Sequence, residues 1–224
     1  MTALNSNHVA ITDSRSLYQK NVYDVKTYKY KVIKKTTDKK LGKTVNKGKL
    51  KGCKIYVLTL EERATCDDSC EHWLDCYGNN MPFAHRFKIN AELLEAIERD
   101  LDELDAKGKP YLVRLHVLGD FNSVKYVMFW AKQLQKRKLL NIYGYTRNHP
   151  TKPIGKAVKD IRDIYRDRFA VRFSNYPDDP MSAQSEHVSD DGIGCPHQLQ
   201  LAKSCGDCTL CWAMPNKSVI FYDH

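Results

Sequence analysis

From residue 55 onward, hydrophobic and polar positions follow two different periods along the chain. Apolar runs of about four to eight residues are typical of buried strands, whereas apolar residues three or four positions apart predict amphipathic helices. Asn90 can cap the first helix, and Gly108 with Pro110 ends it. The pattern predicts strands at 55–60, 111–118, 141–146, 169–174 and 218–222, and helices at 91–107, 124–136 and 154–165.

This alternation of strand and helix determines the expected fold class. Consecutive strands joined through helices favour a parallel sheet with right-handed crossovers. We therefore expect an α/β protein in which a parallel sheet alternates with helices and curls into a partial (β/α) barrel. Residues that directly follow each strand then meet at one edge of the sheet, where binding and catalysis are usually found.

Residues 1–54 differ in composition from residues 55–224. Thirteen lysines and two aspartates lie between Lys20 and Lys54, so this stretch carries +11 of charge, whereas the whole chain of 224 residues carries +9. We predict a lysine-rich N-terminal extension, with a strand at 25–33 and a loop at 39–51, followed by a metal-binding α/β domain.

Such a block of positive charge predicts a nucleic acid as partner, because lysines beside phosphates release bound counterions. A flexible, solvated arm is the alternative, since charge runs are often only surface. The predicted nucleic-acid contacts are Lys29, Lys31, Lys34, Lys35, Lys39, Lys40 and Lys43.

The chain has eight cysteines, and seven of them fall into two tight groups, with Cys53 apart. Disulfide frameworks belong mainly to small exported domains, whereas this chain has no apolar run long enough for a signal peptide or a membrane helix. We expect a cytoplasmic protein, in the host cytoplasm if it is viral, with no membrane partner. Its thiols would then stay reduced and free to bind one or two metal centres.

The first group consists of Cys66, Cys70 and Cys76, which follow the first predicted strand. Three thiolates leave one metal position open, and an open iron of an iron–sulfur cluster can bind a substrate or cofactor. Alternatively His72, His85 or Cys53 supplies a fourth ligand, and a zinc site merely fixes the loop.

The second group supplies four thiolates within 17 residues, from Cys195, Cys205, Cys208 and Cys211. Four thiolates are a complete ligand set for a metal, but they fit zinc and iron–sulfur clusters alike. The spacing therefore predicts metal binding and leaves the metal open.

Polar residues also follow the second and third predicted strands, as Gly119 with Asp120, and as Arg147 with Asn148. Asp120 could hold an ammonium group through charge-assisted hydrogen bonds, or it could simply lie beside the following helix. Arg147 could clamp a carboxylate or a phosphate. The period of a strand also predicts that Arg114 and His116 point to one face.

The stretches CDDSCEHWLDCYG, RLHVLGDFNS, IYGYTRN and CGDCTLCW resemble the uncharacterised phage family called gene product 88, over roughly residues 50–215. More distantly, the order of these motifs resembles a reduced radical S-adenosylmethionine core. That resemblance implies that the three cysteines of the first group hold an iron–sulfur cluster. It also implies that Gly119 and Asp120 receive the amino group of S-adenosylmethionine, and that Asn148 lies near its ribose or carboxylate.

Three functions are therefore expected from the sequence, in order of preference. The first is a radical S-adenosylmethionine-like enzyme that modifies a nucleic acid or nucleotide, with Asp120 and Arg147 in its active site. The second is a base transglycosylase of the deazaguanine type, in which Asp120 attacks the glycosidic carbon and the second cysteine group holds a structural zinc. The third is a non-enzymatic, metal-stapled module that binds nucleic acid.

Overall fold

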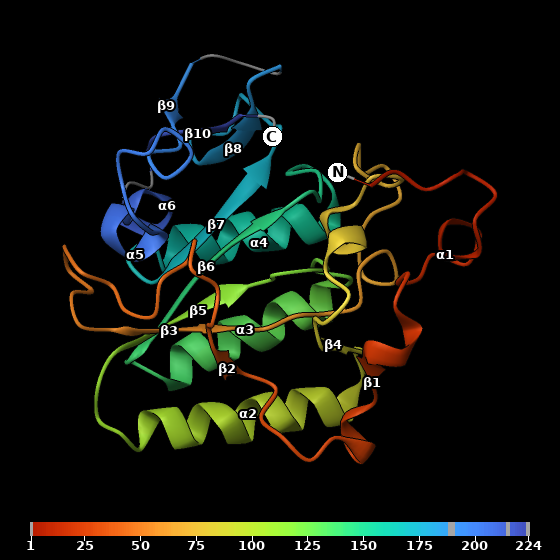
Figure 1. The fold of residues 1–224 in the computed structure, drawn as a ribbon. Coiled ribbons are helices and arrows are strands. Elements are labelled where there is room, and N and C mark those ends of the chain that lie inside the picture. Colours follow the sequence, from red (N-terminus) through yellow and green to blue (C-terminus); the bar gives the residue numbers. More distant parts are fainter. Residues whose placement is uncertain (1, 188–190, 214–215, 223–224) are drawn as a thin grey trace.

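The computed structural model describes residues 2–187, 191–213 and 216–222. Its centre is an eight-stranded sheet in the order β2-β3-β5-β6-β7-β8-β10-β9, in which only the β2–β3 pair is antiparallel (Figure 1). The prediction of an α/β protein with a mostly parallel sheet is confirmed. The strands are β2 (Lys34–Lys35), β3 (Lys54–Val57), β5 (Tyr111–Leu115), β6 (Leu140–Thr146), β7 (Phe169–Ser174), β8 (Ser182–Ser185), β9 (Ile193–Gly194) and β10 (Val219–Phe221).

Three long helices connect the central strands: α2 (Ala91–Asp105), α3 (Val124–Lys136) and α4 (Pro153–Ile164). As predicted, the Asn90 side chain caps α2, where its oxygen accepts a hydrogen bond from the Leu93 amide at 2.8 Å. The apolar sides of all three helices share one core with alternate residues of the strands, among them Val113 and Val171. The three crossover helices therefore cover the same face of the sheet.

The opposite face of the sheet is covered by short segments from both ends of the chain. Ile55, Leu112 and Tyr143 on this face pack with Val45 and with Cys211. Two short helices, α5 (Cys205–Cys208) and α6 (Leu210–Ala213), carry three cysteines of the second group over this surface. The sheet thus has a helical outer face and an inner face covered by the cysteine-rich C-terminal segment.

Residues 1–54 contribute to the body of the molecule. Val32 and Ile33 are buried in the main core, and their amides donate hydrogen bonds to the buried Asp100 carboxylate at 2.7 and 2.9 Å. The strand predicted at 25–33 is wrong: Asp24 caps a 3₁₀ helix there, and β2 begins at Lys34. The remaining elements before α2 are α1 (Val9–Thr12), η1 (Gln19–Asn21), β1 (Val22–Tyr23), η2 (Val25–Thr27), η3 (Tyr77–Asn80) and β4 (Arg86–Phe87).

Strand β5 is shorter than predicted, and this changes where two polar residues point. It ends at Leu115, so the alternation does not continue to His116. Arg114 lines a cavity on the inner face, whereas the His116 ring packs between Phe121 and Tyr126 in the helical core. The prediction that both residues share a face is therefore wrong.

In the described part of the chain, no helix combines the length and the apolar composition needed to cross a membrane.

Candidate functional site

The first cysteine group lies on the long loop between β3 and β4, beside the turn that follows β5. Burial raises the pKa of the thiols of Cys66, Cys70 and Cys76; Cys70 and Cys76 add to the shift of Cys66, and Cys70 adds to that of Cys76. The carboxylate of Asp120 also raises the pKa of Cys66. The structure therefore brings the three predicted thiols together, close to the predicted acidic turn.

Buried arginines hold this loop in shape. Arg86 forms an ion pair with Glu62 at 2.7 Å, and both side chains are almost fully buried. Its guanidinium also donates hydrogen bonds to the carbonyl oxygens of Gly78 and Met81. Arg63 donates to the Trp73 carbonyl at 3.0 Å. The loop is therefore a braced structure, and no regular pattern in the sequence indicated these contacts.

Asp120 connects three segments of the chain. One carboxylate oxygen accepts a hydrogen bond from the Phe121 amide at 2.7 Å, and the other accepts from the Arg147 amide at 2.8 Å. Burial raises the pKa of Asp120 to about 6, although these hydrogen bonds oppose the shift. Both oxygens are thus already engaged within the chain.

Gly119 allows the turn to approach the cysteine loop closely. Its φ is +81°, a conformation that favours glycine. A Cβ atom at this position would lie 2.5 Å from the Thr65 hydroxyl oxygen and 2.6 Å from the Leu60 Cβ. Only glycine therefore fits the predicted Gly119–Asp120 turn without displacing the start of the loop.

Arg147 and Asn148 follow β6, as predicted, and both form hydrogen bonds to neighbouring loops at this edge of the sheet. The Arg147 guanidinium donates to Glu71 of the cysteine loop at 2.8 Å and lies 4.8 Å from the centre of the Tyr176 ring. Glu71 also accepts a hydrogen bond from Asn175 at 2.6 Å. The carboxylate that Arg147 clamps in this structure is therefore Glu71. Asn148 donates to the Phe121 carbonyl at 3.0 Å.

The residues considered as a fourth ligand have other partners. His72 contacts Asp75 at 3.2 Å, and His85 contacts the Tyr28 hydroxyl at 2.8 Å. Cys53 is buried in the apolar cluster of the inner face with Val45. Both histidine contacts use only Nδ1, so a fourth ligand from His72 or His85 stays a prediction.

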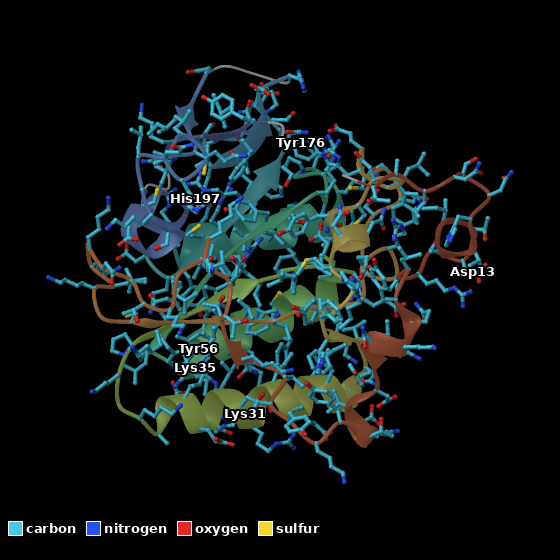
Figure 2. All side chains as sticks on the ribbon, in the orientation of Figure 1. Asp13, Lys31, Lys35, Tyr56, Tyr176 and His197 are labelled. Carbon is cyan, nitrogen blue, oxygen red and sulfur yellow. The ribbon has the colours of Figure 1, made fainter. Side chains whose placement is uncertain are left out.

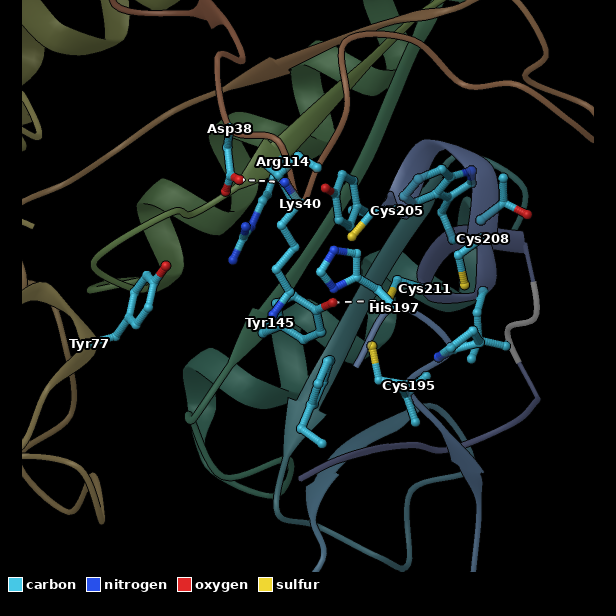
Figure 3. A pocket seen from close by; sticks show the side chains of 18 residues that line it. Asp38, Lys40, Tyr77, Arg114, Tyr145, Cys195, His197, Cys205, Cys208 and Cys211 are labelled. Carbon is cyan, nitrogen blue, oxygen red and sulfur yellow. Dashed lines mark hydrogen bonds between the residues drawn. The ribbon is translucent and has the colours of Figure 1, made fainter. Parts of the chain in front are cut away.

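The second cysteine group surrounds a cavity of about 200 Å³ on the inner face of the sheet (Figure 3). Its four cysteines come from the end of β9, from α5 and from α6. Burial raises the pKa of Cys205 to about 12. The Tyr145 hydroxyl on β6 donates to the Cys211 sulfur at 3.0 Å, and the Trp212 ring lies 4.8 Å from that of Tyr143. The cysteines that line the cavity are Cys195, Cys205, Cys208 and Cys211.

Arg172 on β7 anchors this segment to the sheet. Its fully buried guanidinium donates hydrogen bonds to the carbonyl oxygens of Leu210, Cys211, Ser182 and Lys217 at 2.6–3.2 Å. A charged residue inside an otherwise apolar predicted strand is the signal that could have identified it.

The predicted lysines divide between two surfaces. Lys31, Lys34 and Lys35 line a groove beside α2, together with Tyr30 and Lys107. Figure 2 shows Lys31, Lys35 and Tyr56 next to this helix. Within the groove, Lys31 forms an ion pair with Glu103. Of the remaining candidates, Lys40 lines the cavity of the second cysteine group, and Lys29, Lys39 and Lys43 are exposed.

The described residues contain no group of three or more Cys, His, Asp or Glu side chains placed as ligands of one metal ion. The donor chemistry nevertheless fits thiolate-bound metal: three neighbouring thiols stand at the edge of the sheet, and four more line one cavity. Fold and site together define an α/β protein with two cysteine-rich segments against one parallel sheet. Comparison with protein-family models, curated proteins and solved structures finds no match to this chain.

Proposed function

We propose that this chain is an iron–sulfur enzyme that uses S-adenosylmethionine to modify a nucleic acid or nucleotide. The observation that carries the proposal is the meeting of three loops at the carboxyl ends of β3, β5 and β6. The first loop supplies the thiols of the first cysteine group, the second supplies Gly119 and Asp120, and the third supplies Asn148. This is the edge at which parallel sheets place their chemistry.

Each residue of this edge has a proposed role. Cys66, Cys70 and Cys76 would hold an iron–sulfur cluster, which would supply the electron for reductive cleavage of S-adenosylmethionine. The Gly119–Asp120 turn and Asn148 orient that cofactor. Because both Asp120 oxygens already accept amide hydrogen bonds, we propose that its charge and the turn, and not a free carboxylate, act on the cofactor.

The architecture supports a partial (β/α) barrel as the finer description of the fold. Strands β3, β5, β6, β7 and β8 follow one another across the sheet in chain order, and the crossover helices pack on one face. This arrangement leaves the carboxyl ends of the strands for ligands, as in barrels whose active sites open there.

The second cysteine group is proposed to hold a second cluster. A single zinc ion draws its four sulfurs to about 2.3 Å from itself, whereas a cluster separates its thiolates by iron and sulfide. The presence of all four thiols along one cavity supports a cluster at this group. Zinc at this group belongs to the transglycosylase alternative, which is less well supported because it leaves the first cysteine group without a role.

The test is the content of iron and acid-labile sulfide in protein purified without oxygen. We expect brown protein with about four irons per cysteine group. Replacing all three cysteines of the first group by serine should remove half of the iron and abolish release of 5′-deoxyadenosine from S-adenosylmethionine. Cys53→Ala is the matched control and should change neither quantity. Colourless protein with stoichiometric zinc would contradict the proposal and favour the transglycosylase.

A further inference from the structure

The cavity beside the second cysteine group has two chemically different ends. Figure 3 shows the labelled cysteines at one end, and Asp38, Lys40, Arg114 and Tyr77 toward the other. Tyr77 belongs to the first cysteine loop and directly follows Cys76. The polar end of the cavity therefore lies between the two cysteine groups.

Arg114 is held on β5 in an environment that does not satisfy its side chain. Its Nε is buried, and within the described part of the chain it has no hydrogen-bond partner. The same holds for the hydroxyl of Tyr143, which lines the cavity from the neighbouring strand. Folded proteins rarely leave buried donors unpaired, because each unpaired donor destabilises the fold. Two such donors beside one cavity indicate a ligand that accepts hydrogen bonds.

The two cations at this end outnumber its one carboxylate, Asp38, whose charge also interacts with Arg114. Arg114 and Lys40 supply two cations, and among the described side chains neither forms an ion pair. The one carboxylate at this end, Asp38, accepts a hydrogen bond from the Lys40 amide at 2.7 Å. The Lys40 carbonyl accepts from the Cys205 amide, also at 2.7 Å, so its backbone is fixed to the cysteine segment.

A guanidinium, an ammonium and a phenol that approach from three segments of the chain suit a tetrahedral oxyanion. Arginine forms paired hydrogen bonds to phosphate, and lysine adds a point charge. The cavity, at about 200 Å³, is smaller than the roughly 300–1,000 Å³ of pockets for drug-sized ligands. Because the cysteines take up one end of this volume, the polar end has room for a phosphate group and not for a duplex.

We infer that Arg114, Lys40 and Tyr143 form a subsite for a phosphate monoester, either of a free nucleotide or at the 5′ end of an oligonucleotide. This inference rests on the proposed function, which makes a nucleotide or nucleic acid the substrate, and it identifies the group by which that substrate is held. The bound phosphate would place the substrate between the two cysteine groups.

The test is calorimetric titration of the full chain, purified without oxygen, with paired ligands. One pair is a nucleoside 5′-monophosphate and its nucleoside, and the other is a short oligonucleotide with a 5′-phosphate or a 5′-hydroxyl. We expect the phosphorylated member to bind at least tenfold more tightly in one pair or both, and the pair with the larger ratio identifies the source of the phosphate. Equal binding within both pairs would overturn the inference.

Substitutions of the cavity residues test whether they cause the preference for the phosphorylated ligand. Arg114→Gln should reduce the preference for the phosphorylated ligand by about tenfold or more, because it removes a charge-assisted interaction. Arg166→Gln changes an exposed arginine elsewhere and should preserve the preference. If Arg114→Gln does not fold, Lys40→Gln and Tyr143→Phe replace it. A preference that survives in these folded variants contradicts the assignment.

Failure of this inference and failure of the proposed function are distinguishable. Protein without iron that still prefers the phosphorylated ligand would retain the subsite and overturn the iron–sulfur proposal. Brown protein that cleaves S-adenosylmethionine but binds both members of each pair equally would overturn only the subsite.

Discussion

At the scale of single residues, buried polar groups divide into those satisfied within the chain and those that are not. Arg172 finds four carbonyl oxygens, and the two oxygens of Asp120 accept two amide hydrogen bonds. The Arg114 Nε and the Tyr143 hydroxyl have no such partner among the described residues. Arg172 and Asp120 stabilise the fold, and the unpaired donors of Arg114 and Tyr143, which lie beside one cavity, mark the place where a ligand would complete it.

The buried His116 should make the free energy of unfolding depend on pH. Burial lowers its pKa to about 3, and its Nε2 contacts the Tyr126 hydroxyl at 2.9 Å. The unfolded chain takes up a proton near pH 6.5 that the folded chain excludes. The free energy of unfolding should therefore fall as the pH is lowered from about 6.5 toward 3, by at most about 1.4 kcal/mol per pH unit from this group.

The His116→Gln variant removes this titration and keeps a polar partner for Tyr126. Urea unfolding of the wild type and the variant between pH 4 and 7 measures the difference between their free energies of unfolding. The contributions of other titrating groups are common to both proteins and cancel in this difference. The difference should shrink as the pH falls. A difference that does not depend on pH would show that His116 does not titrate in this way.

At the scale of elements, the two cysteine segments are attached to the sheet by different means. The first loop is braced from within by Arg63 and Arg86, and its Glu71 reaches Arg147 beyond β6. The second segment is held by Arg172 on β7 and by backbone hydrogen bonds to residues 40–46, such as that from the Cys205 amide to the Lys40 carbonyl. A change at Arg172 should therefore loosen the second group and leave the first in place.

Arg172→Met tests this dependence. The variant leaves buried carbonyl oxygens without donors, so we expect the free energy of unfolding to fall by about 3 kcal/mol or more. Cys205, Cys208 and Cys211 should also react faster with a thiol reagent in metal-free protein, whereas the first group should keep its rate. Arg166→Met is the control, because its ion pair with Asp163 is exposed and should contribute less than about 1 kcal/mol. Equal reaction rates in wild type and variant would show that Arg172 does not hold the segment.

At the scale of the whole molecule, the sequence predicts the elements with a regular hydrophobic period and misses those without one. The three long helices and the central strands have clear periods, and the structure confirms them. Strands β8 and β9 were not predicted, because Ser182–Ser185 is polar and small, and β9 has only two residues. Contacts such as Arg86–Glu62 join residues whose pairing follows no sequence period.

The candidate site, too, could be predicted only where its residues follow from the regular pattern of strands. Its residues at the ends of β3, β5 and β6 could be predicted because a parallel sheet gathers the ends of its strands. The cavity of the second group depends on where residues 36–53 and 191–213 fold back over the inner face, and no local pattern contains that information. The lysines illustrate this most clearly, since one run in the sequence divides between a groove beside α2 and the cavity.

This division makes a prediction about how the whole molecule binds a polyanion. If the groove beside α2 is the binding surface, removing its charges should weaken binding more than removing the same charge elsewhere. Lys35 and Lys107 line the groove, whereas Lys132 and Lys159 are exposed on α3 and α4.

We expect Lys35→Gln with Lys107→Gln to lower the slope of log affinity against log salt by about 1.4 for a single-stranded oligonucleotide, because each lost phosphate contact removes about 0.7. Lys132→Gln with Lys159→Gln removes equal charge and should leave the slope unchanged. Fluorescence anisotropy with a labelled oligonucleotide at several salt concentrations measures both slopes, and equal changes would mean that net charge alone, and not the groove, drives binding. Binding through the groove that persists when Asp120 and Arg147 are replaced, in protein that never cleaves S-adenosylmethionine, would favour the non-enzymatic module over the enzyme.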